Sequence, residues 1–371
     1  MDPSTHSAKS RIATSQSGHS ESRSLPAVTS WVIRCPNWVG DIVMATPVFE
    51  SLRATYPDAE ITALIRPYAR GIIENSPWFD HILDCDDKSL RGLQEIRRNG
   101  SVRKWQAGLL LTNTTHSFLT LKLAGVKRTY GYKRNTRRFF LTDGPSPQTD
   151  GKVYKALPMQ DYYLELCRYL GMTLPAKPKP KLYIDDALSA FGQRYLAEKG
   201  VLPGDMLIGL NPGASFGSSK CWPAGNFARL AELLQKLYDC KIILLVGPGE
   251  EGIAAQIVAA SGASIINTAD DLLNLAQLKP VIKQCNLLIT NDTGPRHFAV
   301  AFDVPAVVLM GPTNPLYTAS HLDRTSVIRL DLPCSPCHKK VCPYKHHACM
   351  NEITPNMVVT ASSKYLTASI T

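Results

Sequence analysis

Residues 287–313, LLITNDTGPRHFAVAFDVPAVVLMGPT, carry the pattern on which the rest of the chain is organised. Residues 287–290 are apolar or β-branched, which predicts a buried strand. The polar turn Asn-Asp-Thr-Gly follows, and Pro295 suits the first turn of a helix that runs on through residues 297–302. Residues 306–310 are a second apolar run, ended by Gly-Pro. The stretch therefore predicts strand, turn, short helix and strand.

The turn at residues 291–294 is a predicted anion site. A helix N-terminus carries free N–H groups and a partial positive charge, which favour a ligand such as a pyrophosphate. Asp292 and His297 lie on either side of this turn, and an imidazole there suits a phosphate or a sugar hydroxyl. The alternatives are a buried structural role for His297 and a helix N-cap role for Thr293.

Alternation of strands and helices extends outward from this unit over the whole chain. Short apolar strands are expected at residues 31–34, 60–65, 107–111, 128–132, 206–210, 242–246 and 263–266, and helices between them, including residues 42–55 and 154–170. Such alternation predicts parallel sheets covered by helices on both faces. The segment 175–182, PAKPKPKL, reads as a linker because proline disfavours helix and sheet interiors. We expect an N-terminal domain at 29–175 and a C-terminal domain at 183–354.

The bulk properties agree with two globular domains in 371 residues. The net charge of +10 favours an anionic partner, whether nucleic acid, a nucleotide or an anionic membrane, although scattered solvated charge explains it equally well. No apolar run approaches the roughly 20 residues that span a bilayer. The N-terminus lacks the apolar core of a secretory signal, and we expect residues 1–28 to be a disordered tail.

The ten cysteines fall into two groups. Six are isolated, which is typical of free thiols in a reducing compartment. The other four lie in one loop-like stretch with His346 and His347; they are Cys334, Cys337, Cys342 and Cys349. Their spacing permits a zinc site. A compact loop with reduced thiols is the preferred interpretation, and no metal is predicted.

Asp41 is the candidate catalytic group of the first half. It follows Gly40 where the first predicted strand passes into the first helix, at the sheet edge where open α/β proteins bind ligands. A carboxylate there suits a general base that accepts a proton from a substrate hydroxyl. The alternative is a helix-capping aspartate.

Three further segments carry charge suited to a nucleotide or an anionic acceptor. Residues 211–220, NPGASFGSSK, combine glycines with Lys220, but lack the Gly-Lys-Ser/Thr ending of a P-loop. Glu250 and Glu251 follow a strand, where an acid often meets a ribose diol; two exposed acids at a helix start are the alternative. Residues 127–138 mix basic and aromatic side chains, which suits nucleic acid or a phosphorylated lipid sugar.

Five segments together resemble glycosyltransferase family 9, the ADP-heptose:lipopolysaccharide heptosyltransferases, and within it the heptosyltransferase II branch. They are residues 36–41 (PNWVGD) with 45–47 (ATP), 211–214 (NPGA) with Lys220 and 222–223 (WP), 291–294 (NDTG) with His297, 311–313 (GPT), and 334–350. The resemblance implies an α/β GT-B fold, with two Rossmann-like domains facing across a cleft. The acceptor is expected on the N-terminal domain and the nucleotide sugar mostly on the other, with residues 355–371 crossing back as a helix.

The resemblance also implies an inverting enzyme without cofactor or metal. It would move heptose from ADP-heptose to the lipid A-linked core oligosaccharide, at the cytoplasmic face of the inner membrane and in peripheral contact with it. No nucleic acid partner is expected. Another nucleotide sugar or acceptor on the same fold is the alternative. The implied general base is Asp41. The implied donor-binding residues are Lys220, Ser215, Glu250, Glu251, Asp292, Thr293, Gly294 and His297. The implied acceptor-binding residues are Lys133, Arg134 and Arg137. One departure from the family is the pair Pro295-Arg296 before His297, where a small or apolar pair is usual.

Overall fold

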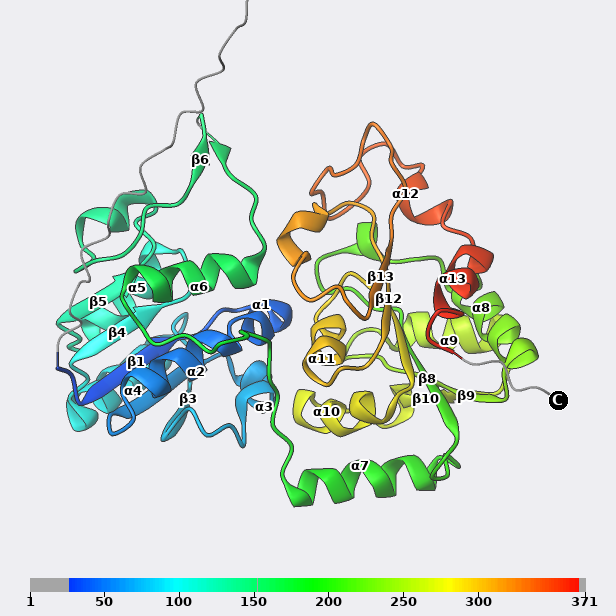
Figure 1. Ribbon diagram of the computed structural model, residues 1–371, viewed down its shortest axis with the longest axis horizontal. Coiled ribbons are helices and arrows are strands. Elements are labelled where there is room, and N and C mark those ends of the chain that lie inside the picture. Colours follow the sequence, from blue (N-terminus) through cyan, green and yellow to red (C-terminus); the bar gives the residue numbers. More distant parts are fainter. Residues whose placement is uncertain (1–26, 152, 367–371) are drawn as a thin grey trace, which may run out of the picture.

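The computed structural model describes residues 27–151 and 153–366, which form two α/β domains side by side (Figure 1). The N-terminal domain is built on a five-stranded parallel sheet of order β3-β2-β1-β4-β5. The C-terminal domain is built on a six-stranded parallel sheet of order β10-β9-β8-β11-β12-β13. The order reverses between β1 and β4 in one sheet and between β8 and β11 in the other. Such switch points are where open α/β sheets bind ligands.

The strands match the short apolar runs of the sequence. In the N-terminal sheet they are β1 (Ser30–Arg34), β2 (Glu60–Ile65), β3 (His81–Asp84), β4 (Ala107–Leu110) and β5 (Arg128–Gly131). In the C-terminal sheet they are β8 (Met206–Asn211), β9 (Cys240–Leu244), β10 (Ile265–Asn267), β11 (Leu287–Asn291), β12 (Ala306–Leu309) and β13 (Thr325–Ile328). A two-stranded antiparallel ribbon, β6 (Thr149–Asp150) and β7 (Val153–Tyr154), extends from the N-terminal domain.

The helices cover both faces of each sheet (Figure 1). Those of the N-terminal domain are α1 (Val39–Met44), α2 (Thr46–Thr55), α3 (Arg70–Ile73), α4 (Leu90–Arg103), α5 (Thr115–Leu123) and α6 (Met159–Tyr169). Those of the C-terminal domain are α7 (Asp186–Glu198), α8 (Ala224–Leu237), α9 (Glu251–Ala260), α10 (Leu275–Gln284), α11 (Pro295–Ala301), α12 (Ala348–Asn351) and α13 (Pro355–Ser362). Short 3₁₀ turns include η1 (Pro67–Ala69), η2 (Asn135–Phe139), η3 (Ser218–Lys220), η4 (Thr268–Asp270) and η5 (Pro315–Thr318).

Two predicted helices are shorter than expected because of proline. The helix expected at residues 42–55 is broken at Ala45 into α1 and α2. Pro47 has no N–H, and its ring would clash with the carbonyl four residues earlier in a continuous helix. The hydroxyl of Thr46 instead donates to the Val43 carbonyl at 2.8 Å. The helix expected at residues 154–170 likewise begins only after Pro158, as α6.

The two domains meet through apolar contacts. Helix α1 packs on α11, and α3 packs on α10. One cluster of buried side chains runs through both domains, and it includes Trp31 and Val43 on one side and Leu278 and Phe298 on the other. The carboxyl edges of the two sheets are therefore held close to each other.

The prediction that residues 355–371 cross back to the N-terminal domain is wrong for the described part of that segment. Helix α13 packs on α8, β12 and β13 of its own domain, far from the N-terminal domain in Figure 1. Val358 and Leu366 are buried in the apolar cluster on that side of the C-terminal sheet, which holds the segment there. Residues 367–371, like residues 1–26 of the predicted tail, lie outside the described residues.

No helix in residues 27–151 and 153–366 combines the length and the apolar character needed to cross a bilayer.

Candidate active site

Asp41 lies in the first turn of α1, directly after the switch point of the N-terminal sheet. The helix is capped by Trp38 without a side-chain hydrogen bond, so the capping interpretation of Asp41 does not hold. No residue in the described part of the chain donates a hydrogen bond to its half-buried carboxylate. Burial raises the pKa of Asp41 to about 6, and the only opposing influence is the charge of Lys220 on the other domain. The group is therefore placed as an unpaired carboxylate that titrates near neutral pH.

The approach of the two domains at this point depends on two glycines. A Cβ atom on Gly40 would lie 2.8 Å from Cδ2 of His297, and one on Gly294 would lie 2.5 Å from Cγ1 of Val39. Both distances are far below ordinary contact, so any side chain at either position would push α1 and α11 apart. The backbone beside Asp41 can therefore lie against the turn that precedes α11.

His297 is buried at this contact. Burial lowers its pKa to about 3, and the neighbouring Arg296 guanidinium acts in the same direction. The imidazole is therefore neutral at physiological pH and packs against Gly40. This placement favours the buried structural role that the sequence left open.

Asp292 is the centre of the charged cluster on the C-terminal domain. Its Oδ1 accepts from Nη1 of Arg296 at 2.9 Å, and its Oδ2 accepts from Nζ of Lys220 and from Oγ1 of Thr313, both at 2.8 Å. The charges of Lys220 and Arg296 hold the pKa of this buried carboxyl well below its usual range. Arg296 also donates to Oγ1 of Thr318 at 2.8 Å. The residue that departs from the family pattern thus joins the NDTG turn to η5.

A second network, which the sequence analysis missed, ties the loops after β8 and β11 together. Oδ1 of Asn211 accepts from Oγ1 of Thr290 at 3.0 Å and from Oγ1 of Thr293 at 2.9 Å. Nδ2 of Asn291 donates to the Pro212 carbonyl at 2.6 Å. Both strands end in asparagine beside the switch point, and that shared feature was the available signal. The network fixes the Lys220 loop against the Asp292 turn.

The segment with four cysteines contacts Ser219, the residue before Lys220. Oγ of Ser219 donates to the Lys339 carbonyl at 2.6 Å, and its N–H donates to the Lys340 carbonyl at 3.1 Å. Nε2 of His347 lies 2.7 Å from the Ser219 carbonyl oxygen. Across residues 27–151 and 153–366, no three His, Cys, Asp or Glu side chains are arranged to hold a metal ion.

Glu250 and Glu251 occupy different environments. The carboxylate of Glu250 accepts from the Gly247 N–H at 2.9 Å and lies directly against Gly213 of the Lys220 loop. Burial raises its pKa. Glu251 is exposed in the first turn of α9, and Ser215 is exposed on the loop itself. Of the two acids, Glu250 is the one that reaches the predicted nucleotide side.

A family model described as glycosyltransferase family 9 (heptosyltransferase) matches residues 96–348, more than half of the chain. The chain belongs to glycosyltransferase family 9. It is 27% identical over 348 residues to lipooligosaccharide heptosyltransferase 2 of Campylobacter jejuni, covering 90% of this chain and 97% of that one. The structure of Escherichia coli ADP-heptose lipopolysaccharide heptosyltransferase II superposes with a TM-score of 0.72 at 24% identity, covering 91% and 98% of the two chains. A family 9 glycosyltransferase from Veillonella parvula superposes with a TM-score of 0.82 at 24% identity, covering 93% and 99%. These matches confirm the expected GT-B fold, the glycosyltransferase class and the resemblance to the heptosyltransferase II branch.

The basic residues of segment 127–138 in this family 9 enzyme lie in different environments. Nζ of Lys133 is paired with Oδ1 of Asp143 at 3.0 Å. Arg134 stacks on the ring of Tyr154, with 3.9 Å from Cζ to the ring centroid. Of the three predicted acceptor residues, Arg134 is the half-buried cation that has no acidic partner among the ion pairs of the described residues.

Arg137 is not available to an acceptor, which corrects the sequence prediction. Its side chain is fully buried, and its guanidinium donates to the carbonyls of Tyr132 and Thr112 and to Oδ1 of Asn113. Burial lowers its pKa to about 10. We therefore reassign Arg137 from acceptor contact to positioning of the loop that follows β4.

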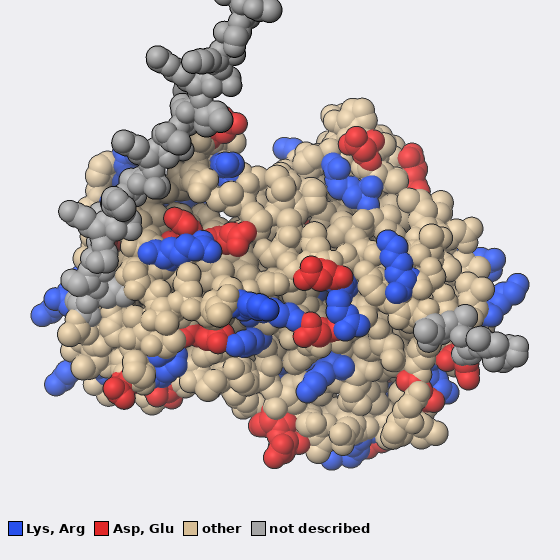
Figure 2. Space-filling model, in the orientation of Figure 1, with Lys and Arg blue, Asp and Glu red and all other residues tan. Residues whose placement is uncertain are grey.

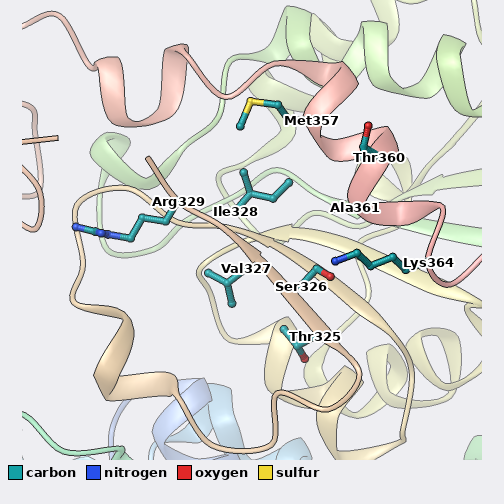
Figure 3. Close-up of a pocket in the computed structure, with 9 residues that line it drawn as sticks. All are labelled: Thr325, Ser326, Val327, Ile328, Arg329, Met357, Thr360, Ala361 and Lys364. Atoms are coloured by element: carbon teal, nitrogen blue, oxygen red, sulfur yellow. The ribbon is translucent and has the colours of Figure 1, made fainter. Parts of the chain in front are cut away.

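Two features outside the candidate site were compared with the predictions: a pocket on the C-terminal domain and the charge on one face of the molecule. A surface pocket of about 490 Å³ lies between β13 and α13, and none of the predicted site residues lines it (Figure 3). On the face shown in Figure 2, Lys and Arg side chains are interspersed with Asp and Glu over both domains. That face therefore lacks the continuous positive surface expected of a nucleic acid interface.

Proposed function

We propose that this glycosyltransferase moves L-glycero-D-manno-heptose from ADP-heptose to the heptosyl-Kdo lipid A inner core of lipopolysaccharide, with inversion at the anomeric carbon. The observation that carries the proposal is the Asp41 carboxylate, which has no hydrogen-bond donor among the described residues and whose pKa, raised by burial, is lowered in part by the charge of Lys220 on the other domain. The names of the Campylobacter and Escherichia relatives support the choice of donor and acceptor.

In the proposed reaction, Asp41 accepts the proton of an acceptor hydroxyl as its oxygen attacks the anomeric carbon. The bond from that carbon to the diphosphate breaks, and ADP leaves with the electron pair. Because attack and departure take place on opposite faces, the configuration inverts. The pKa of about 6 suits this role, since a base is most effective when its pKa lies near the working pH.

Lys220 stabilises the charge that grows on the departing diphosphate. An ammonium group has three donors, and two of them reach the carbonyl and carboxylate oxygens of Asp292. Nζ also lies 5.3 Å from the centroid of the Phe216 ring, and we assign its third donor to a phosphate oxygen. Because Asp292 and the asparagine network hold this amine in place, little reorganisation accompanies the reaction. Thr293 and Gly294 are assigned to the phosphate turn, and Ser215, on the loop that leads to Lys220, is assigned to the donor. Glu250 is assigned to the adenosine ribose.

The acceptor is assigned to the N-terminal domain. Arg134, with Lys133 beside it, would meet anionic groups of the core sugar. The lipid anchor of such an acceptor implies work at the cytoplasmic face of the inner membrane, in peripheral contact with it.

Turnover with a panel of nucleotide sugars tests the proposal against the alternative of another donor or acceptor on the same fold. ADP-heptose with heptosyl-Kdo lipid A is expected to give a product one heptose heavier by mass spectrometry, and ADP in equal amount. Transfer from a different nucleotide sugar, with none from ADP-heptose, would overturn the proposed donor and leave the fold-level assignment intact.

A further inference from the structure

We infer that the outer surface of α5 and η2 docks onto an anionic lipid surface. This inference rests on the proposed function, because a lipid-linked acceptor would be bound at a membrane surface. We call the surface the α5–η2 patch, and it consists of Leu119, Leu123, Phe139 and Phe140.

The four side chains of the α5–η2 patch are unusually exposed for apolar residues. Phe139 is 71% exposed, Phe140 60%, Leu123 57% and Leu119 51%. Single exposed apolar side chains are common on soluble proteins, but several together mark an interaction surface.

The contacts show that the two elements carrying the four residues are neighbours. The ring of Phe140 stacks on that of Phe118 in α5, with 5.9 Å between the centroids. Leu119 is the next residue along α5, and Leu123 lies one turn further on the same face. The hydroxyls of Thr115 and Thr136 are 3.1 Å apart and join η2 to the start of α5. The patch is therefore one surface made by two neighbouring elements.

The charge around the patch identifies the partner. Residues 107–142 contain seven Lys and Arg and no Asp or Glu, although Arg137 is buried and Lys133 is paired with Asp143. Nζ of Lys122 lies 5.6 Å from the Phe118 ring centroid and donates to the Lys127 carbonyl, and the Arg138 guanidinium lies 4.6 Å from the Phe139 ring. Exposed aromatic and leucine side chains bordered by cations are the features that insert into the headgroup region of anionic bilayers. An apolar surface meant for a second copy of the chain would gain nothing from a border of like charges.

One end of the patch lies at the sheet edge used in the proposed reaction. Helix α5 follows β4, whose carboxyl end borders the switch point next to β1. Oδ1 of Asn113, in the loop between β4 and α5, accepts from the hydroxyl of Tyr162 at 3.1 Å. The η2 end of the patch is therefore near the sheet edge that carries Asp41, and α5 extends the patch away from that edge toward Leu123.

Vesicle flotation tests the inference directly. The full chain is mixed with vesicles of phosphatidylethanolamine and phosphatidylglycerol, or with vesicles of neutral phosphatidylcholine. We expect binding to the anionic vesicles, weakened by salt, and a loss of about tenfold or more in partitioning for Phe139→Ser/Phe140→Ser. The matched control is Leu202→Ser/Leu237→Ser, two exposed leucines of the C-terminal domain that are 63% and 49% exposed. Circular dichroism checks that both variants are folded.

Failure of the wild type to float with anionic vesicles, equal binding to neutral ones, or an equal loss in both variants would overturn the inference. Sedimentation showing that the wild type is a dimer and that Phe139→Ser/Phe140→Ser is a monomer would also overturn it. Transfer to a deacylated, water-soluble core acceptor separates the two proposals. The patch variant should match the wild type with that acceptor and fall behind with vesicle-bound acceptor. Absence of any transfer would count against the proposed function alone.

Discussion

The two aspartates of the site, one on each domain, have opposite environments. Asp292 is buried among Lys220, Arg296 and Thr313, and these partners hold its pKa low. Asp41 is desolvated and has no hydrogen-bond or ion-pair partner among the described residues, and its pKa rises to about 6. The paired Asp292 carboxylate stays ionised at neutral pH and does not readily take up a proton. Asp41, with its raised pKa, does. The comparison assigns the electrostatic framework to the C-terminal domain and proton transfer to the N-terminal domain.

The largest expected effect is on turnover of Asp41→Asn. Removal of a general base lowers kcat by about 10²–10⁴-fold. Binding of ADP, measured by calorimetry, should be unchanged because no donor contact is assigned to Asp41. Loss of ADP binding together with turnover would show that the two aspartates do not divide the work as described.

Asp292→Ala should instead act on stability. It leaves Lys220 and Arg296 without their shared partner in a buried site, and we expect the free energy of unfolding to fall by about 3–5 kcal/mol. Asp292→Asn, which keeps the shape and one acceptor oxygen, should lose less. Chemical denaturation followed by fluorescence measures both. Equal stability of Asp292→Ala and the wild type would contradict the pairing.

Lys220→Gln tests whether the charge of Lys220, which is paired with Asp292, also acts on Asp41. Loss of a positioned donor should lower kcat by about 10²–10³-fold. The charge of Lys220 also opposes the rise in the Asp41 pKa, so its removal should move the acid limb of the pH–rate profile to higher pH. An unchanged limb in this variant would mean that Asp41 and Lys220 do not interact across the domains.

The smallest expected effect is a gain in stability for Asp41→Asn at neutral pH. An ordinary aspartate has a pKa of 3.8, whereas Asp41 has one of about 6, so its charged form disfavours the folded state. The stability that it contributes is present below pH 3.8 and is lost as the pH rises through about 6. The variant should therefore be more stable than the wild type by about 3 kcal/mol at pH 7.5 and similar at pH 4. Thermal unfolding at the two pH values measures the difference.

The positions of Asp41, Lys220 and Asp292 were predictable, because each follows a strand that an apolar run in the sequence indicates. Their pairing was not. Lys220 and Asp292 are 72 residues apart, and only the meeting of the β8 and β11 loops brings them together. The burial of Arg137 was also hidden, since a run of basic residues looks the same whether its members face solvent or the interior. The choice between Glu250 and Glu251 depended on which one lies over Gly213.

The errors in the predicted fold have two kinds of cause, local sequence effects and packing between distant segments. Pro47 was visible in the sequence, and its effect on the helix at residues 42–55 could have been anticipated. The edge strand β13 was not predicted, because residues 325–328 are only half-buried and lack a long apolar run. The docking of α13 on α8 is decided by packing between distant segments, to which a helical pattern gives no guide.

The pH dependence of kcat/KM, compared between the wild type and Asp41→Asn, tests the central claim most directly. The account predicts that wild-type transfer falls about tenfold per pH unit below an apparent pKa of about 6, and that the residual activity of Asp41→Asn shows no such limb. An Asp41→Asn enzyme with wild-type rates and the same acid limb would contradict it.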